Sequence, residues 1–208
     1  MTVETWILYV GTVLLFMSTP GPSHLLMLSV SMSNGFSRSL ATASGDLTAN
    51  LIQMLLAGFG LAAVITASEV GFSAVKWAGV VYLVWVGVRQ IIASFNRSDE
   101  ASVERPAEFR TLWLRGFVTS AANPKAVVFF AALFPQFLSA DAPLASQMII
   151  LGGTYLLIDG CFLAAYGKGA SWLADKLKGQ YRAWIERGAG VSLIAAALML
   201  GLRSHARD

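Results

Sequence analysis

Ser18-Thr19-Pro20-Gly21-Pro22 interrupts the first long apolar run of the chain, at about residues 4–30. A proline inside a helix removes a backbone hydrogen bond and clashes with the preceding turn, so this stretch predicts a broken helix. Asn123-Pro124-Lys125 interrupts another apolar run, at about residues 112–138, in the same way. In a membrane, the unpaired backbone groups at such breaks must be buried in protein or face a water-filled cavity. The two breaks together predict a site, although a single proline is more often a kink that improves packing.

The composition indicates that the surrounding solvent is lipid. Hydrophobic residues make up 56% of the 208 residues and charged residues 13%, whereas about 25% of a soluble domain is charged. A soluble fold of this length has to expose much of its surface to water, and this composition offers too little polar surface for that. The net charge of +3 comes from Lys and Arg in short loops between apolar runs, a pattern typical of membrane orientation and not of nucleic-acid binding.

The apolar runs predict about six transmembrane helices, because a helix needs about 20 mostly apolar residues to cross the hydrocarbon core. The runs lie at about residues 4–30, 40–66, 74–93, 112–138, 145–165 and 188–202. We expect an all-α polytopic membrane protein that forms one transporter domain over residues 1–208. Five spans are the main alternative, because Arg203 and Arg207 follow the last run.

Lys and Arg gather in every second connection between the runs. The odd-numbered connections hold eleven of them, and the termini with the even-numbered connections hold three. Because positive residues stay on the cytoplasmic side, we expect the odd-numbered connections in the cytoplasm and both termini on the opposite, periplasmic side.

A long polar stretch divides the six predicted helices into two halves of three. We expect the first half at residues 1–95, a cytoplasmic linker at residues 96–111, and the second half at residues 112–208. Each half begins with a proline-broken helix and has one Asp in its next helix, Asp46 or Asp159. Three helices per half make the second half enter the membrane from the opposite side, which predicts an inverted repeat, a common plan for secondary transporters.

Asp46, Asp159 and Lys125 are charged residues inside predicted spans. A charge at that depth costs about 2.5 to 3.5 kcal/mol on insertion scales and marks a functional site by default. We expect the two acids and the two breaks to meet in a hydrated pocket within the membrane. A structural ion pair between Lys125 and the acids, or a Lys125 that reaches the membrane surface, are the alternatives.

Other polar residues near these positions extend the candidate site. Asn50 and Gln53 follow Asp46 by four and seven positions, so they share its helix face as a polar stripe that suits a transport path. Hydrogen bonding between helices explains such a stripe equally well. His24 follows the first break and titrates near neutral pH, but a hydrogen-bonded structural imidazole is an equal alternative.

Several kinds of chemistry have little support in the sequence. The only cysteine, Cys161, excludes an intrachain disulfide and Cys-based metal sites. No Gly-rich nucleotide loop ending in Lys-Ser/Thr is present, so we expect no ATP, no other cofactor and no enzyme activity. Two membrane aspartates are also the requirement of an intramembrane aspartyl protease, but Ser44-Gly45-Asp46 and Ile158-Asp159 lack the glycine and tyrosine expected before such acids.

Several short motifs occur in a characteristic order along most of the chain. They are Ser18-Thr19-Pro20-Gly21-Pro22, Gly35 before Arg38, Gly45-Asp46, Lys76-Trp77-Ala78-Gly79 with Tyr82-Leu83, Trp85-Val86-Gly87, Phe117, Asn123-Pro124-Lys125, Phe130 and Phe134-Pro135-Gln136-Phe137. In this order and spacing the sequence resembles the LysE/RhtB family of bacterial amino-acid efflux proteins.

The resemblance implies a small secondary transporter in the bacterial inner membrane. It implies that a small amino-acid-like substrate leaves the cytoplasm while protons drive the exchange, and members of the family often form homo-oligomers. Heavy-metal efflux is the alternative within the same superfamily, although soft metals favour thiolates and Cys161 is the only one. Ser23-His24 departs from the family pattern, since many members carry Asn directly after the second proline, and this bears on the substrate class.

Overall fold

The computed structural model describes residues 2–60, 107–139 and 142–176, with isolated positions between residues 77 and 92 and between 187 and 195. Every secondary-structure element in these ranges is helical, which confirms the predicted all-α fold. The elements are α1 (Val3–Ser18), α2 (Pro22–Asn34), α3 (Phe36–Gly58), α6 (Phe109–Ala121), α7 (Pro124–Val128), the π-helical η1 (Phe129–Leu133), the 3-10 helix η2 (Phe134–Phe137) and α8 (Leu144–Lys176). The predicted third and sixth spans and most of the predicted linker lie largely outside the described residues.

Both predicted helix breaks are confirmed. The axes of α1 and α2 differ by 58° across the Pro20–Pro22 stretch, and α6 differs by 52° from the segment Lys125–Phe137. Each second half starts with proline at its first turn, where the missing N–H group costs nothing. The side chain of Asn123 caps the start of α7, because its Oδ1 accepts the Lys125 N–H group at 3.1 Å.

One described helix is long and apolar enough to cross a membrane alone, the segment Leu144–Ala174 of 31 residues, and there are up to three such spans if each bent pair counts as one. The predicted span at residues 145–165 lies within α8, and this helix continues beyond it to Lys176. Lys168 and Lys176, expected in a connection, lie on this helix. Six spans and the inverted repeat remain predictions.

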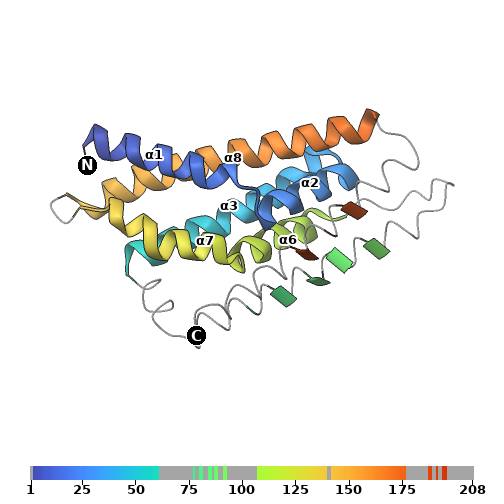
Figure 1. Ribbon diagram of the computed structural model, residues 1–208, viewed down its shortest axis with the longest axis horizontal. Helices are drawn as coiled ribbons and strands as arrows, with labels where there is room; N and C mark the ends of the chain where they lie inside the picture. Colours follow the sequence, from blue (N-terminus) through green and yellow to red (C-terminus); the bar gives the residue numbers. More distant parts are fainter. Residues whose placement is uncertain are drawn as a thin grey trace.

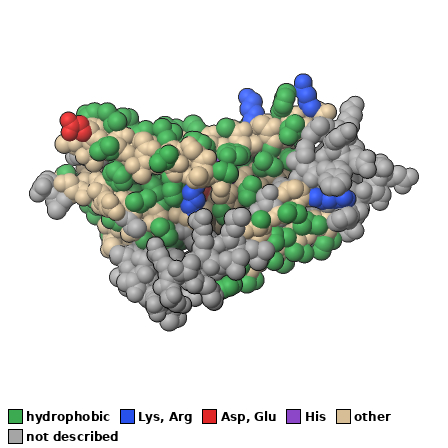
Figure 2. Space-filling model, viewed as in Figure 1, with side chains coloured by type: hydrophobic (Ala, Val, Ile, Leu, Met, Phe, Trp, Pro, Cys, Tyr) green, Lys and Arg blue, Asp and Glu red, His purple; other side chains and the backbone are tan. Residues whose placement is uncertain are grey.

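The outer surface separates charge from apolar area. Leu15 on α1 and Ile149 and Leu157 on α8 are at least 70% exposed. Figure 2 shows hydrophobic and uncharged side chains over most of the face in view, with most Lys and Arg side chains toward the end where α8 finishes. Such a surface suits contact with lipid along the flanks and with water at the ends.

Helix α3 is the centre of the described bundle, in contact with α2, α6 and α8 (Figure 1). Its most extensive contact is with α6, where the two backbones touch at two glycines. A Cβ atom on Gly45 would collide with the carbonyl oxygen of Trp113, and one on Gly116 would collide with the carbonyl oxygen of Thr42. Close approach through small residues is how membrane helices gain packing contacts, since lipid provides no hydrophobic drive between helices.

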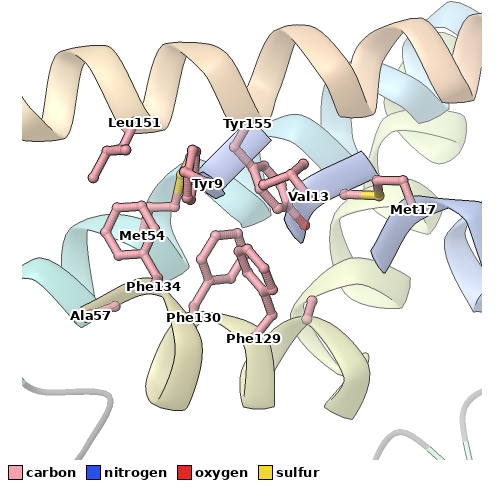
Figure 3. Close-up of a cluster of buried hydrophobic side chains, with 11 residues drawn as sticks. Tyr9, Val13, Met17, Met54, Ala57, Phe129, Phe130, Phe134, Leu151 and Tyr155 are labelled. Carbon is pink, nitrogen blue, oxygen red and sulfur yellow. The ribbon is translucent and has the colours of Figure 1, made fainter. Parts of the chain in front are cut away.

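An aromatic cluster fills the space between α1, α8 and the segment that follows α7 (Figure 3). Its rings are Tyr9, Phe129, Phe130, Phe134 and Tyr155. The Phe130 and Tyr155 ring centroids lie 4.7 Å apart, and Tyr9 meets Phe134 edge to face at 6.2 Å. These contacts hold the irregular π and 3-10 turns against two regular helices, and they cover one side of the candidate site.

Gln147 fixes the turn before α8. Its side chain is 2% exposed, and it accepts the Ser139 N–H group at 2.8 Å while donating to the carbonyl oxygens of Ser139 and Ala142, each at 2.9 Å. Gln147→Met removes these bonds and is expected to lower the free energy of unfolding by about 1–2 kcal/mol. Thermal unfolding in detergent measures this, with Ile149→Met, a substitution at an exposed position of α8, as the control. An unchanged unfolding temperature in Gln147→Met would show that the turn does not depend on this side chain.

Candidate functional site

The two helix breaks touch each other, although about one hundred residues separate them in the chain. A Cβ atom placed on Gly21 would lie 3.6 Å from Cδ of Lys125 and 4.0 Å from Nδ2 of Asn123. These distances are ordinary van der Waals contacts, so position 21 borders directly on the second break. The described structure thus brings Pro20–Pro22 and Asn123–Lys125 to one place, as expected from the sequence.

Lys125 binds the end of α1. Its Nζ donates to the carbonyl oxygens of Phe16 and Thr19, each at 2.6 Å, and to the Thr19 hydroxyl at 2.9 Å. The ammonium also lies 4.3 Å from the centroid of the Phe16 ring. The last carbonyl groups of a helix have no partner within the helix and carry partial negative charge, so an ammonium stabilises them. Lys125 therefore compensates for the hydrogen bonds that the first break removes, and within the described chain none of its hydrogen bonds goes to a carboxylate.

Asp46 and Asp159 form a buried pair bridged by one amide. Each is 2% exposed, and Nδ2 of Asn50 donates to Oδ2 of Asp46 at 2.9 Å and to Oδ2 of Asp159 at 2.8 Å. Oδ1 of the same amide accepts the Ser120 hydroxyl at 2.9 Å. Asn50 thereby joins α3, α6 and α8 at the level of the breaks, and its place fits the predicted polar stripe on α3.

Gln53, the other member of the predicted stripe, binds the backbone of α6 and not the acid pair. Its Nε2 donates to the carbonyl oxygens of Ser120 and Ala121 at 3.2 and 3.3 Å, at the end of α6. This is the interhelical hydrogen bonding that we considered as the alternative to a path. The first half of each broken span thus has its final carbonyl groups bound by a side chain from elsewhere, α1 by Lys125 and α6 by Gln53.

His24 lies in the first turn of α2 and is 4% exposed. Its Nδ1 accepts the Gly21 N–H group at 3.3 Å, and its ring contacts Tyr166 at a centroid distance of 4.9 Å. These contacts fit a structural imidazole that stabilises the first break. Its Nε2 is buried and has no hydrogen-bond partner among the described residues.

Side chains from both breaks and from the acid pair enclose one small cavity. Its lining consists of Phe16, Met17, Gly21, Ser23, His24, Asp46, Asn50, Ser120, Asn123, Lys125, Ala126, Tyr155 and Asp159. The centres of water molecules can occupy about 20 Å³ of it, which is room for about one water. Within the part of the chain that the structure describes, two polar atoms in this lining have no hydrogen-bond partner, Oδ1 of Asp46 and Nε2 of His24. The cavity therefore offers unused hydrogen-bonding capacity but is closed to anything as large as an amino acid.

The sequence model of the LysE type translocator family matches residues 14–204 of the chain. The chain belongs to the LysE-type translocator family. This confirms the resemblance inferred from the motifs, which the matched range includes.

Curated relatives of this LysE-type translocator have names that refer to efflux. It is 31% identical to the homoserine/homoserine lactone efflux protein of Salmonella typhi over 205 residues, 98% of this chain and 99% of the relative. It is 29% identical to the leucine efflux protein of Salmonella choleraesuis (strain SC-B67) over 160 residues, 76% of this chain and 75% of the relative. No solved structure matches the chain significantly.

Six residues that line the cavity of this LysE-type translocator were not among the predicted site residues: Phe16, Met17, Ser23, Ser120, Ala126 and Tyr155. Ser120 holds the bridging amide, and Phe16 and Tyr155 supply its apolar wall. A serine or an aromatic residue inside an apolar span has no pattern that separates it from ordinary packing. Among the described residues no group of three or more His, Cys, Asp or Glu side chains is placed to hold a metal ion.

Proposed function

We propose that this protein exports amino acids or closely related small zwitterions from the cytoplasm, as a secondary transporter driven by the proton gradient. The observation that carries the proposal is the pair of buried carboxylates that faces one cavity together with two opened helices. Relatives named as homoserine/homoserine lactone and leucine efflux proteins support the substrate class.

The substrate ammonium is proposed to bind at the acid pair. Asp46 lines the cavity, and its buried Oδ1 accepts no hydrogen bond from any of the described residues. The first turn of α2, opened by Pro20–Pro22, is proposed to receive the substrate carboxylate, because the free N–H groups and the dipole at a helix start favour an anion. Both groups of an amino acid then have a complementary partner at the same cavity, which has to widen to admit the substrate, since the space described holds about one water molecule.

Coupling is proposed to follow from competition at the acid pair. Two carboxylates that share one amide donor need a positive charge between them, since unpaired charge at membrane depth is costly. A proton or a substrate ammonium meets this need, and the small space admits one of them at a time. Substrate binding on the cytoplasmic side then releases a proton, and proton binding on the other side releases the substrate.

Orientation and assembly are proposed from the charge distribution and the family. We place the protein in a bacterial inner membrane, with the end that carries Arg38, Lys168 and Lys176 in the cytoplasm and both termini in the periplasm. We retain the arrangement of six spans in two inverted repeats within one domain, and a homo-oligomer as its assembled form.

Efflux from proteoliposomes tests the proposed function. Purified protein is reconstituted into vesicles loaded with labelled leucine, homoserine or another single amino acid, with an alkaline interior and an acidic exterior. We expect efflux faster than from protein-free vesicles for at least one amino acid, and we expect a protonophore to remove the acceleration. If the preparation is folded and correctly inserted and no amino acid shows accelerated efflux, the proposal is refuted. Release of metal ions would favour metal efflux, and cleavage of a model transmembrane peptide would favour a protease.

A further inference from the structure

The end of α1 has the features of an ammonium-binding site. Three oxygen atoms, the carbonyl oxygens of Phe16 and Thr19 and the Thr19 hydroxyl, surround Nζ of Lys125 at 2.6 to 2.9 Å. The face of the Phe16 ring covers the same ammonium at 4.3 Å. Three acceptors match the three N–H donors of a primary ammonium, and an aromatic face adds cation–π attraction.

This place does not require that the ammonium be part of the chain. Its acceptors belong to α1 and to the first break, whereas the ammonium reaches it from the second break. Phe16 and Lys125 line the same cavity as the acid pair, so a ligand in that cavity borders both positions. At the acid pair the buried Oδ1 of Asp46 has no partner in the described ranges of the chain, which makes it the place for an incoming ammonium, while the end of α1 is already occupied by Lys125.

We propose that the cavity contains two ammonium sites, and that Lys125 fills the second with its own side chain and thereby restricts the substrates to molecules with a single ammonium. The inference rests on the proposed function, because it names the substrate class of the same site. The acid pair receives the α-ammonium of a neutral amino acid. A diamino acid carries a second ammonium. This group cannot bind at the end of α1, because Lys125 occupies the place and its positive charge repels the second ammonium. Lys125 is thus a specificity-determining residue.

Lys125→Ala tests this inference. The substitution removes three carbon atoms and the ammonium, and it leaves the acceptors of Phe16 and Thr19 in place. Because hydrogen bonds to a charged group contribute strongly, we expect efflux of the best neutral amino acid to fall about tenfold or more. We expect efflux of one member of a diamino acid series with increasing chain length, 2,3-diaminopropionate, ornithine and lysine, to rise about tenfold above wild type, where the second ammonium matches the spacing.

Propylammonium provides a second measurement, since it has the same three carbon atoms and ammonium as the deleted group. At equal concentration on both sides of the vesicle membrane, propylammonium is expected to restore neutral amino-acid efflux in Lys125→Ala. In detergent it is expected to raise the unfolding temperature of the variant and not that of the wild type. Tetramethylammonium is the matched control, because it carries the charge without an N–H donor and is expected to do neither.

Lys125→Arg is the control variant, because it keeps a cation at the end of α1 and is expected to gain no diamino acid efflux. The inference is overturned if folded Lys125→Ala responds to neither diamino acids nor propylammonium. It is also overturned if the wild-type protein exports diamino acids at the same rate as neutral amino acids. A wild-type protein that exports no amino acid at all refutes the proposed function instead, so the two failures are distinguishable.

Discussion

Asp159→Asn and Asp46→Asn are each expected to reduce proton-driven amino-acid efflux by about 100-fold or more, which corresponds to about 2.7 kcal/mol. Each variant replaces one carboxylate of the pair by an amide of the same shape. The amide has no charge to attract a substrate ammonium, and it does not bind and release a proton in the working pH range. Substrate binding and proton binding both depend on the acid pair in the proposed cycle. The expected loss of efflux is therefore larger than the loss of a single hydrogen bond would cause.

The folded structure is expected to survive these substitutions. Nδ2 of Asn50 can still donate to the side-chain oxygen of an asparagine, and one of two neighbouring negative charges disappears. Thermal unfolding in detergent is therefore expected at or above the wild-type temperature, whereas efflux from proteoliposomes is lost. Glu108→Gln is the matched control, because this exposed carboxylate lies outside the cavity. Efflux at the wild-type rate in both Asp variants would remove the acid pair from the mechanism.

Gly116→Val is expected to prevent stable packing of α3 against α6. The added Cβ atom overlaps the carbonyl oxygen of Thr42, and it comes within 3.1 Å of the Asp46 backbone nitrogen. Backbone atoms within a helix cannot turn aside as a side chain does, so the two helices have to separate. Overpacking of this kind costs about 3 kcal/mol or more. The separation would also displace Asn50 from Asp159 on α8 and from Ser120 on α6.

Fluorescence-detected size-exclusion chromatography of tagged variants measures this loss of folded protein. Gly153→Val is the matched control, since a Cβ atom at this helical glycine meets nothing within 4 Å in the described structure. Gly45→Val should resemble Gly116→Val, because its Cβ atom meets the backbone of Trp113 and Phe117 from the opposite helix. Monodisperse Gly116→Val protein in wild-type amount would mean that α3 and α6 do not approach as closely as described here.

Composition, proline positions and short motifs were enough to predict the lipid surroundings, the two helix breaks and the family. Apolar composition needs only residue counts, and the helix breaks at Pro20–Pro22 and Asn123–Lys125 follow from the chemistry of the proline ring, which acts on its own turn. Asp46 and Asp159 were recognisable as candidate residues because a charge within an apolar run is costly wherever its helix packs. These are local properties, and no knowledge of neighbouring helices is needed to recognise them.

The hydrogen-bond partner of each polar side chain became known only from the packing of the helices. Helical spacing placed Asn50 and Gln53 on one face, but Asn50 bridges the two acids whereas Gln53 binds the end of α6. An ion pair between Lys125 and the acids was the structural alternative considered from the sequence, whereas Lys125 binds the end of α1. The close contact between Gly116 on α6 and the backbone of α3 could not be predicted from the sequence either. Periodicity gives the direction of a side chain relative to its own helix, whereas its partner depends on how close and at what angle another helix passes, and that depends on packing across the whole bundle.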